Sequence, residues 1–362
     1  MNNRTFASDN YAGVHPEILD ALTHANAGHA RAYGADPWTA RLHEVVRGHF
    51  GEQAVTYPVF NGTGANVVAL MSMLPRWGAV VTSRHAHITN DENAAPERVG
   101  GIKLLTVDAP DGKLTPASID TEAWGWGDQH RAQPLVVSLT QSTELGTVYT
   151  PDELGVLTEH AHSLGMRVHM DGARLANAAA RLGLGLKEMT TDVGIDVLSF
   201  GGTKNGLMFG EAVVVLDPAA VEGVDYVRKM TMQLASKMRF ASAQLVALLE
   251  GDLWLRSATH ANAMAARLRT RLDELVAAGT APGLAFSQST EVNAVFATLP
   301  PEAANRLRQQ FAFYDWDAAR GEVRWMCSFD TTDADVDAFV EAIADELARV
   351  TDAGPARART AG

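Results

Sequence analysis

Three short stretches of the sequence carry residue types that together could do chemistry. Lys204 lies in the glycine-rich run Ser199–Gly206, directly after an apolar segment. A partly desolvated lysine amine near other cations is a nucleophile. Asp171 follows a second apolar segment, and a buried carboxylate needs a cation or a donor beside it. The turn Gly62-Thr63-Gly64 precedes an apolar helical stretch, and a helix N-terminus attracts anions. Each signal alone also has an ordinary structural explanation.

One cofactor, pyridoxal phosphate, requires all three elements at once. It needs an amine for a Schiff base, a carboxylate for its ring nitrogen and a cradle for its phosphate. The chain has only six lysines, and Lys204 alone combines a strand end with flanking glycines. A nucleotide site is disfavoured, because the sequence has neither GxGxxG nor GxxxxGK[ST]. A metal site is not expected, because His85 and His87 lack a third ligand at suitable spacing.

Alternating apolar strands and helices must position these residues. The run Thr150-Pro151-Asp152-Glu153 is typical of a capped helix start. Strand–helix–strand order predicts a mostly parallel sheet, whose ligand crevice lies at the carboxyl ends of the strands. His169 alternates with Asp171 along its strand, so it either lines that crevice or packs as a hydrogen-bonded core residue. The expected strands are Thr56–Phe60, Ala79–Thr82, Leu104–Val107, Leu135–Leu139, Arg167–Met170, Val197–Phe200 and Glu211–Leu216.

After about residue 245 the pattern changes to long helices rich in alanine, arginine and leucine. Helices are expected at roughly 256–278 and 333–349, with strands at Val292–Leu299 and Glu322–Cys327 between them. These elements predict a second, smaller α/β unit. We therefore divide the chain into an N-terminal segment (1–20) that packs on the active site or the small domain, a large cofactor-binding domain (21–245), a small C-terminal domain (246–350) and a flexible tail (351–362).

Composition excludes several classes of partner. The 362 residues include 30 basic and 43 acidic side chains, a net charge of −13, which argues against binding to nucleic acid or an anionic membrane. No apolar run reaches the roughly 18–20 residues that span a bilayer. The single cysteine, Cys327, cannot form an internal disulfide, so we expect a cytoplasmic protein.

Several motifs spread over nearly the whole chain resemble those of one enzyme family. This is the threonine aldolase and β-eliminating lyase family of fold type I pyridoxal-phosphate enzymes. The resemblance implies an α/β fold with a mostly parallel central sheet, flanking helices and a smaller C-terminal α/β domain. The matching stretches are Ser8–Asn10, Gly13–Pro16, Tyr33–Pro37, Gly62–Asn66, Ala86–Ile88, Asp171–Leu175, Ser199–Lys204 and Val323-Arg324.

The resemblance assigns roles around the cofactor. Lys204 would form the Schiff base, and Asp171 would pair with the pyridine nitrogen. His87 would stack on the ring, while Gly62 and Thr63 would bind the phosphate.

It also assigns roles around the substrate and between subunits. Arg174 and Arg324 would hold the substrate carboxylate with help from Ser8. Family members carry a second active-site histidine before the strand that precedes the aspartate, and His130 lies near that place. A basic segment of a neighbouring subunit often reaches the phosphate, and Arg239 lies in the matching region. A homodimer or homotetramer with sites shared across subunits is therefore expected.

The implied reaction is retro-aldol cleavage of a β-hydroxy-α-amino acid of the threonine, allo-threonine or phenylserine type, giving glycine and an aldehyde. His87, or a water that it positions, is the candidate base. The alternatives are β-elimination, racemisation or transaldolation on the same cofactor, and a non-catalytic cofactor-binding protein. The chain has Gln141-Ser142-Thr143 where the family often has Glu-Asn-Thr, which bears on the choice of substrate.

Overall fold

The computed structural model describes residues 5–352, which fall into two compact units. Gly13–Thr259 forms the larger unit, and the described residues up to 12 join those from 260 onward in the smaller one. From the sequence, the domain boundaries were expected after residues 20 and 245. In the structure the units divide after Ala12 and after Thr259. The division after Thr259 falls inside helix α11 (Leu253–Ala277), so this helix contributes residues to both units. The predicted tail lies outside the described residues from position 353 onward.

A seven-stranded sheet forms the centre of the larger unit, with strand order β1-β7-β6-β5-β4-β2-β3. The pairs β2–β3, β2–β4, β4–β5 and β5–β6 are parallel, whereas β7 is antiparallel to both of its neighbours. This confirms the predicted, mostly parallel sheet. The bounds are β1 (Val55–Val59), β2 (Gly78–Ser83), β3 (Lys103–Val107), β4 (Gln133–Thr140), β5 (Arg167–Gly172), β6 (Val197–Gly201) and β7 (Glu211–Val215).

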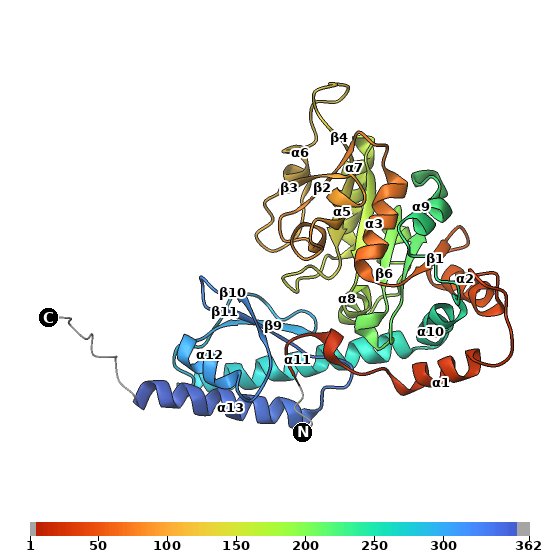
Figure 1. Ribbon diagram of the computed structural model, residues 1–362. Helices are drawn as coiled ribbons and strands as arrows, with labels where there is room; N and C mark the ends of the chain where they lie inside the picture. The colour runs from red at the N-terminus through yellow and green to blue at the C-terminus, as the bar shows by residue number, and fades with distance from the viewer. Residues whose placement is uncertain (1–4, 353–362) are drawn as a thin grey trace. The chain divides into compact units, whose positions relative to one another are not determined.

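Helices pack around this sheet (Figure 1). Their bounds are α1 (Pro16–Ala25), α2 (Pro37–Phe50), α3 (Gly62–Met73), α4 (His87–Asn90), α5 (Ala95–Arg98), α6 (Pro116–Asp120), α7 (Pro151–Ser163), α8 (Leu175–Leu182), α9 (Val224–Met230) and α10 (Arg239–Leu249). The predicted start of α7 is confirmed, because Thr150 and Glu153 form a reciprocal capping box. No helix among the described residues combines the length and the apolar character that a bilayer crossing requires.

The smaller unit contains an antiparallel sheet of order β10-β11-β9-β8, with helices α12 (Pro301–Leu307) and α13 (Asp333–Asp352). Its strands are β8 (Ala285–Phe286), β9 (Ala294–Thr298), β10 (Tyr314–Asp317) and β11 (Glu322–Met326). Phe6 enters this core, where its ring stacks on Phe339 at a centroid distance of 4.2 Å. Its carbonyl accepts a hydrogen bond from the backbone N–H of Met326 at 2.8 Å.

His169 is a core residue of the large sheet. Its ring is fully buried, with Nδ1 2.9 Å from the hydroxyl of Ser138 and Nε2 2.9 Å from the hydroxyl of Ser199. Burial disfavours the imidazolium and lowers the pKa of His169 to about 4. Of the two interpretations open from the sequence, the structure favours the packed, hydrogen-bonded histidine.

This burial makes the stability of the fold dependent on pH. The unfolded chain takes up a proton at His169 at a higher pH than the folded chain does. The stability that it contributes is therefore present above about pH 6.5 and is lost as the pH falls toward 4, by about 3 kcal/mol in total. We expect His169→Gln to remove this part of the pH dependence of the free energy of unfolding, measured by denaturant titration between pH 7 and 4. An unchanged slope in the variant would contradict the assignment.

Candidate active site

The carboxyl edge of the large sheet brings together the residues singled out from the sequence. Strand β1 leads into the turn before α3, β5 ends at Asp171-Gly172, and β6 leads to Lys204. Because these strands run in the same direction, their carboxyl ends meet at one edge. The structure thus places an amine, a carboxylate and a helix N-terminus at the same edge of one sheet.

A close backbone contact joins the loops after β5 and β6. A Cβ atom on Gly201 would lie 2.5 Å from the carbonyl oxygen of Ala173 and 2.6 Å from its Cα. Only glycine permits the two backbones to run this close together. Three residues later Lys204 lies in a short 3-10 turn, Thr203–Asn205, with its side chain half-buried. The contact fixes the lysine loop against the backbone that follows Asp171.

Glu211 holds the lysine loop through hydrogen bonds to its backbone. This residue was not predicted from the sequence. It is the first residue of β7, and the antiparallel register pairs it with Gly201. Its carboxylate accepts the backbone N–H groups of Gly202 and Thr203. Burial raises the pKa of Glu211, although these hydrogen bonds and the charge of Lys204 act in the opposite direction. A buried carboxylate thus lies under the turn that presents the lysine amine.

Asp171 is the second buried carboxylate at this edge. Its Oδ1 accepts the backbone N–H of Ala173 at 3.0 Å, and its Oδ2 accepts Nδ2 of Asn66 at 2.9 Å. The same Nδ2 atom donates to Oε1 of Glu92 at 2.8 Å. The structure adds Asn66 and Glu92 to the site. Asn66 stands at the end of a stretch that already matched the family, but nothing in the sequence showed that Glu92 would be buried.

His87 joins this group through Glu92. Its Nδ1 lies 2.8 Å from Oε1 of Glu92. Burial lowers the pKa of His87, but the hydrogen bond to Glu92 and the charges of Glu144 and Asp171 outweigh this effect, so that the pKa is raised overall. The nearby charge of Lys204 opposes the rise. The surroundings of His87 therefore favour its protonated form.

The start of α3 offers backbone donors to an anion. Asn61 caps the helix, since its Oδ1 accepts the N–H of Gly64 at 2.7 Å and its carbonyl accepts the N–H of Ala65 at 3.0 Å. The preceding N–H groups, of Gly62 and Thr63, are those that a helix start leaves for other partners.

Pyridoxal phosphate fits these residues. Asp171 and Glu92 are two buried carboxylates bridged by one amide, which concentrates negative charge at the edge. A pyridinium N–H beside Asp171 would offset this charge. Lys204 supplies the amine, and the α3 start suits a phosphate.

Two further predicted residues, Arg174 and His130, lie in the larger unit. Arg174 lies two residues after the end of β5, stands at the start of α8 and is buried. The structure does not bring His130 to the edge, and this is a correction. His130 lies in an exposed turn before β4, at the amino end of the strand, because the loop from α6 to β4 returns on the opposite side of the sheet.

The remaining predicted residues have other surroundings. Arg239 begins α10, where its guanidinium donates to the carbonyl of Gly28 at 3.2 Å and lies 5.8 Å from the ring of Trp38. Ser8 and Arg324 belong to the smaller unit. Ser8 caps the turn Asp9–Tyr11, and the Arg324 guanidinium lies 5.0 Å from the ring of Trp316 on the antiparallel sheet.

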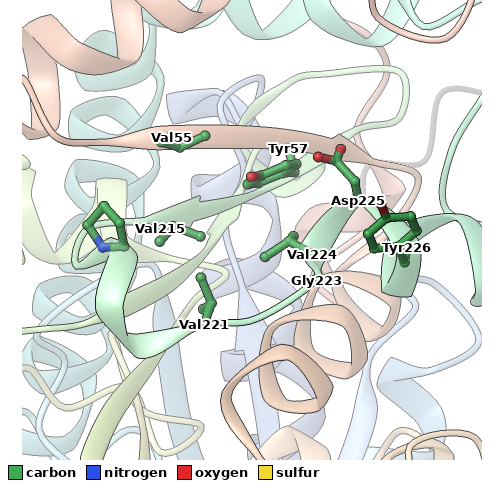
Figure 2. A pocket seen from close by; sticks show the side chains of 9 residues that line it. Val55, Tyr57, Val215, Val221, Gly223, Val224, Asp225 and Tyr226 are labelled. Carbon is green, nitrogen blue, oxygen red and sulfur yellow. The ribbon is translucent and has the colours of Figure 1, made fainter.

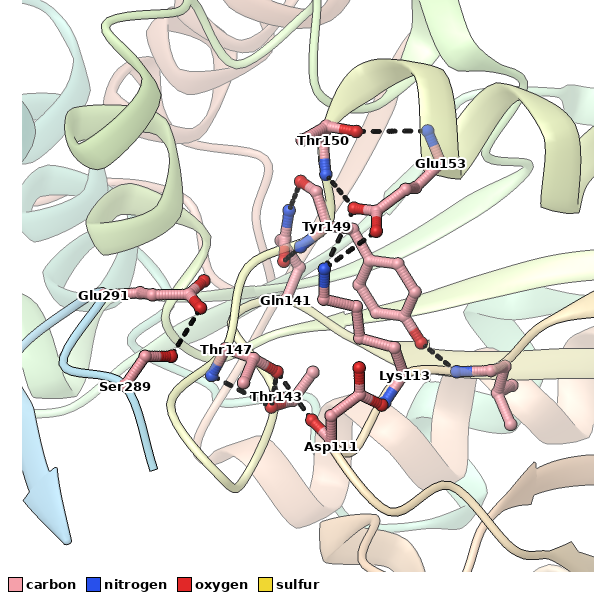
Figure 3. A network of polar contacts seen from close by, with 11 residues as sticks. Asp111, Lys113, Gln141, Thr143, Thr147, Tyr149, Thr150, Glu153, Ser289 and Glu291 are labelled. Atoms are coloured by element: carbon pink, nitrogen blue, oxygen red, sulfur yellow. Dashed lines mark hydrogen bonds and ion pairs between the residues drawn. The ribbon is translucent and has the colours of Figure 1, made fainter. Parts of the chain in front are cut away.

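The segment that departs from the family pattern has an internal role. Both polar atoms of the Gln141 carboxamide bond the backbone of Tyr149, with Nε2 donating to its carbonyl at 2.9 Å and Oε1 accepting its N–H at 3.1 Å. The hydroxyl of Thr143 lies 2.7 Å from that of Thr147 (Figure 3). The Gln141 side chain therefore holds the loop after β4 in place.

Comparison with known proteins identifies the family. Residues 5–299 match the family described as beta-eliminating lyase. The chain belongs to the beta-eliminating lyase family. This confirms the resemblance seen in the sequence.

Two relatives of this lyase family member are similar to it over almost their whole length. A low specificity L-threonine aldolase of Pseudomonas sp. (strain NCIMB 10558) is 45% identical over 92% of this chain and 95% of its own. One of Pseudomonas aeruginosa is 46% identical over 91% of this chain and 94% of its own. Among solved structures, a threonine aldolase of Leishmania major has a TM-score of 0.87 at 28% identity, covering 94% of this chain and 99% of that one. The predicted fold type I architecture is confirmed.

A separate cavity of about 240 Å³ lies at the opposite edge of the sheet (Figure 2). Val55 starts β1 and pairs with Val215 at the end of antiparallel β7, which places both at the amino edge. The cavity is therefore not the place where Lys204 and Asp171 meet. Its lining consists of Val55, Tyr57, Val215, Pro218, Val221, Gly223, Val224, Asp225 and Tyr226.

The contact at Gly201 gives a test of how the lysine loop is held. We expect Gly201→Ala to lower the free energy of unfolding by about 1–3 kcal/mol, because its Cβ would overlap the Ala173 backbone. We also expect the variant to retain less pyridoxal phosphate on dialysis. Gly155→Ala is the control, since that helical position has open space. It should gain roughly 0.5–1 kcal/mol. Equal behaviour of the two variants would contradict this account.

Proposed function

We propose that this chain is a pyridoxal-phosphate-dependent aldolase that cleaves a β-hydroxy-α-amino acid of the threonine type to glycine and an aldehyde. The observation that carries the proposal is the juxtaposition of Lys204 and Asp171 at the carboxyl edge of the sheet. The two Pseudomonas relatives, which are similar over nearly their whole length, support this choice of reaction.

The residues at the edge divide the work of holding the cofactor. Lys204 would bind the aldehyde carbon covalently, and Asp171 would pair with the ring nitrogen and keep it protonated. Gly62 and Thr63 would bind the phosphate at the start of α3. When bound, pyridoxal phosphate supplies a sink for the electron pair left on Cα when the bond to Cβ breaks.

His87 and Arg174 would act on the substrate. Because His87 faces Glu92 through Nδ1, its Nε2 is the atom that can take the proton of the β-hydroxyl group. Arg174 is a buried cation three residues after Asp171 and would hold the substrate carboxylate, so that the Cα–Cβ bond is the one that breaks. The roles of Ser8 and Arg324 in holding the same carboxylate stay predictions.

β-Elimination is the second candidate, because the matched family is described by that reaction. Elimination, racemisation and transaldolation would use the same lysine and aspartate. Product analysis separates them: an aldehyde with glycine marks aldol cleavage, a 2-oxo acid with ammonia marks elimination, and a D-amino acid marks racemisation.

Replacing the lysine tests the proposal directly. We expect Lys204→Ala to abolish the visible absorption of the bound cofactor and to reduce aldehyde release from threonine by several orders of magnitude, since no other amine lies at a comparable place in the sequence. Lys103→Ala, at an exposed position in β3, is the matched control. Retention of both signals in the Lys204 variant would disprove the assignment.

The site is further proposed to be shared between subunits of a homodimer or homotetramer. Arg239 would reach the phosphate bound by a neighbouring subunit. The exposed apolar side chains of Tyr226, Met230 and Met232, on and just after α9, are compatible with burial against a second copy.

Mixing inactive variants tests this sharing. A hybrid of Lys204→Ala and Arg239→Ala subunits has one site with both changes and one site with neither, if Arg239 acts across the interface. We therefore expect a 1:1 mixture, after dissociation and reassociation, to recover about a quarter of the wild-type activity, because about half of the dimers are hybrids and each hybrid has one intact site of two. Failure to recover activity in hybrids verified by mass spectrometry would place Arg239 in its own subunit's site or outside any site.

A further inference from the structure

A chain of buried polar side chains connects the two groups that flank the cofactor position. It runs from His87 through Glu92 and Asn66 to Asp171, with the distances of 2.8, 2.8 and 2.9 Å given above. The Glu92 side chain is completely buried, whereas that of His87 is 30% exposed. Glu92 is a buried acidic side chain, and burying a carboxylate charge is costly unless it is paired.

The chemistry of the amide fixes the direction of each hydrogen bond. The Nδ2 of Asn66 carries two hydrogens, and one points to each carboxylate. Both carboxylates are therefore acceptors. Oε1 of Glu92 accepts from Asn66 and from His87, so Nδ1 of His87 must carry a hydrogen. In the neutral imidazole, Nε2 is then the unprotonated atom.

We propose that Glu92 is a positioning residue that holds His87 in the tautomer with a free Nε2 and sets the pH at which that atom gains its proton. Asn66 holds the Glu92 carboxylate in place and keeps it apart from Asp171. The inference rests on the proposed function for its catalytic consequence, but the state of the His87 ring is a property of the chain alone.

The charged groups around His87 determine the size of the effect. Glu92 contacts the ring directly, while the charges of Asp171 near the end of β5, and of Glu144 and Lys204 in the loops after β4 and β6, also act on it. Three carboxylates favour the imidazolium and one lysine opposes it. Glu92 is the one of these that the structure hydrogen-bonds to the ring. Removing its charge should therefore shift proton uptake more than removing any of the more distant charges.

The first experiment compares Glu92→Gln with Glu97→Gln, an exposed position in α5. The titration of His87 is followed by NMR with ring-labelled histidine, and His87→Gln assigns the signal. We expect the pKa of His87 to fall by about one unit or more in Glu92→Gln and to stay unchanged in Glu97→Gln. The acidic limb of the pH profile of kcat/KM for aldehyde release should move to lower pH by the same amount. Equal titrations in both variants would overturn the proposal.

The second measurement needs no change at Glu92, so it remains informative if Glu92→Gln does not fold. Nitrogen-15 shifts of the His87 ring in the wild-type protein above its pKa report which nitrogen carries the hydrogen. Protonation at Nδ1 supports the proposal, and protonation at Nε2 overturns it. If the proposed function fails instead, the wild-type protein releases no aldehyde, while the ring titration and the tautomer still give their own answer.

Discussion

The burial of carboxylate charge at one edge of a sheet is the constraint on which this structure depends. Asp171, Glu92 and Glu211 are all buried at the edge that also carries the half-buried Lys204. Each is supplied with donors: backbone N–H groups for Glu211, an N–H group and an amide for Asp171, and an amide and an imidazole for Glu92. These donors offset the cost of burying carboxylates at an edge that is proposed to receive a cationic ring.

Strand β7, which runs antiparallel to both of its neighbours in the large sheet, contributes to this arrangement. In an all-parallel sheet the first residue of each strand lies at the edge opposite the crevice. Because β7 runs against its neighbours, its first residue, Glu211, lies at the crevice edge beside Gly201. The strand thus delivers a carboxylate under the lysine loop that a parallel strand in the same place could not deliver.

The sequence predicted the fold well, and it predicted the parts of the site that follow from strand order. All seven strands of the large sheet lie within two residues of their expected bounds, because each is a short apolar run between turn residues. The capping box at Thr150 was predictable for a similar reason, because it joins two residues only three positions apart in the sequence. Contacts between distant segments could not be predicted in this way. In the sequence, Glu92 looks like any acidic residue in a polar loop. Its buried carboxylate is bonded by Asn66, which comes from helix α3.

The smaller sheet shows the same limit. Strand β10 has the sequence Tyr-Asp-Trp-Asp, which lacks an apolar run and forms only through pairing with β11. His130 was misplaced for a related reason: proximity along the chain to a strand does not tell which end of that strand a side chain reaches, and here it is the amino end.

The position of Phe6 has a consequence for the synthesis of the protein. Its backbone and ring find their partners, Met326 and Phe339, only near the other end of the chain. At roughly 5–20 residues per second, translation separates these events by tens of seconds. For that time the nascent chain carries an apolar N-terminal residue whose native partners do not yet exist. The core of the smaller unit around Phe6 can therefore close only after the chain has been synthesised to about residue 339.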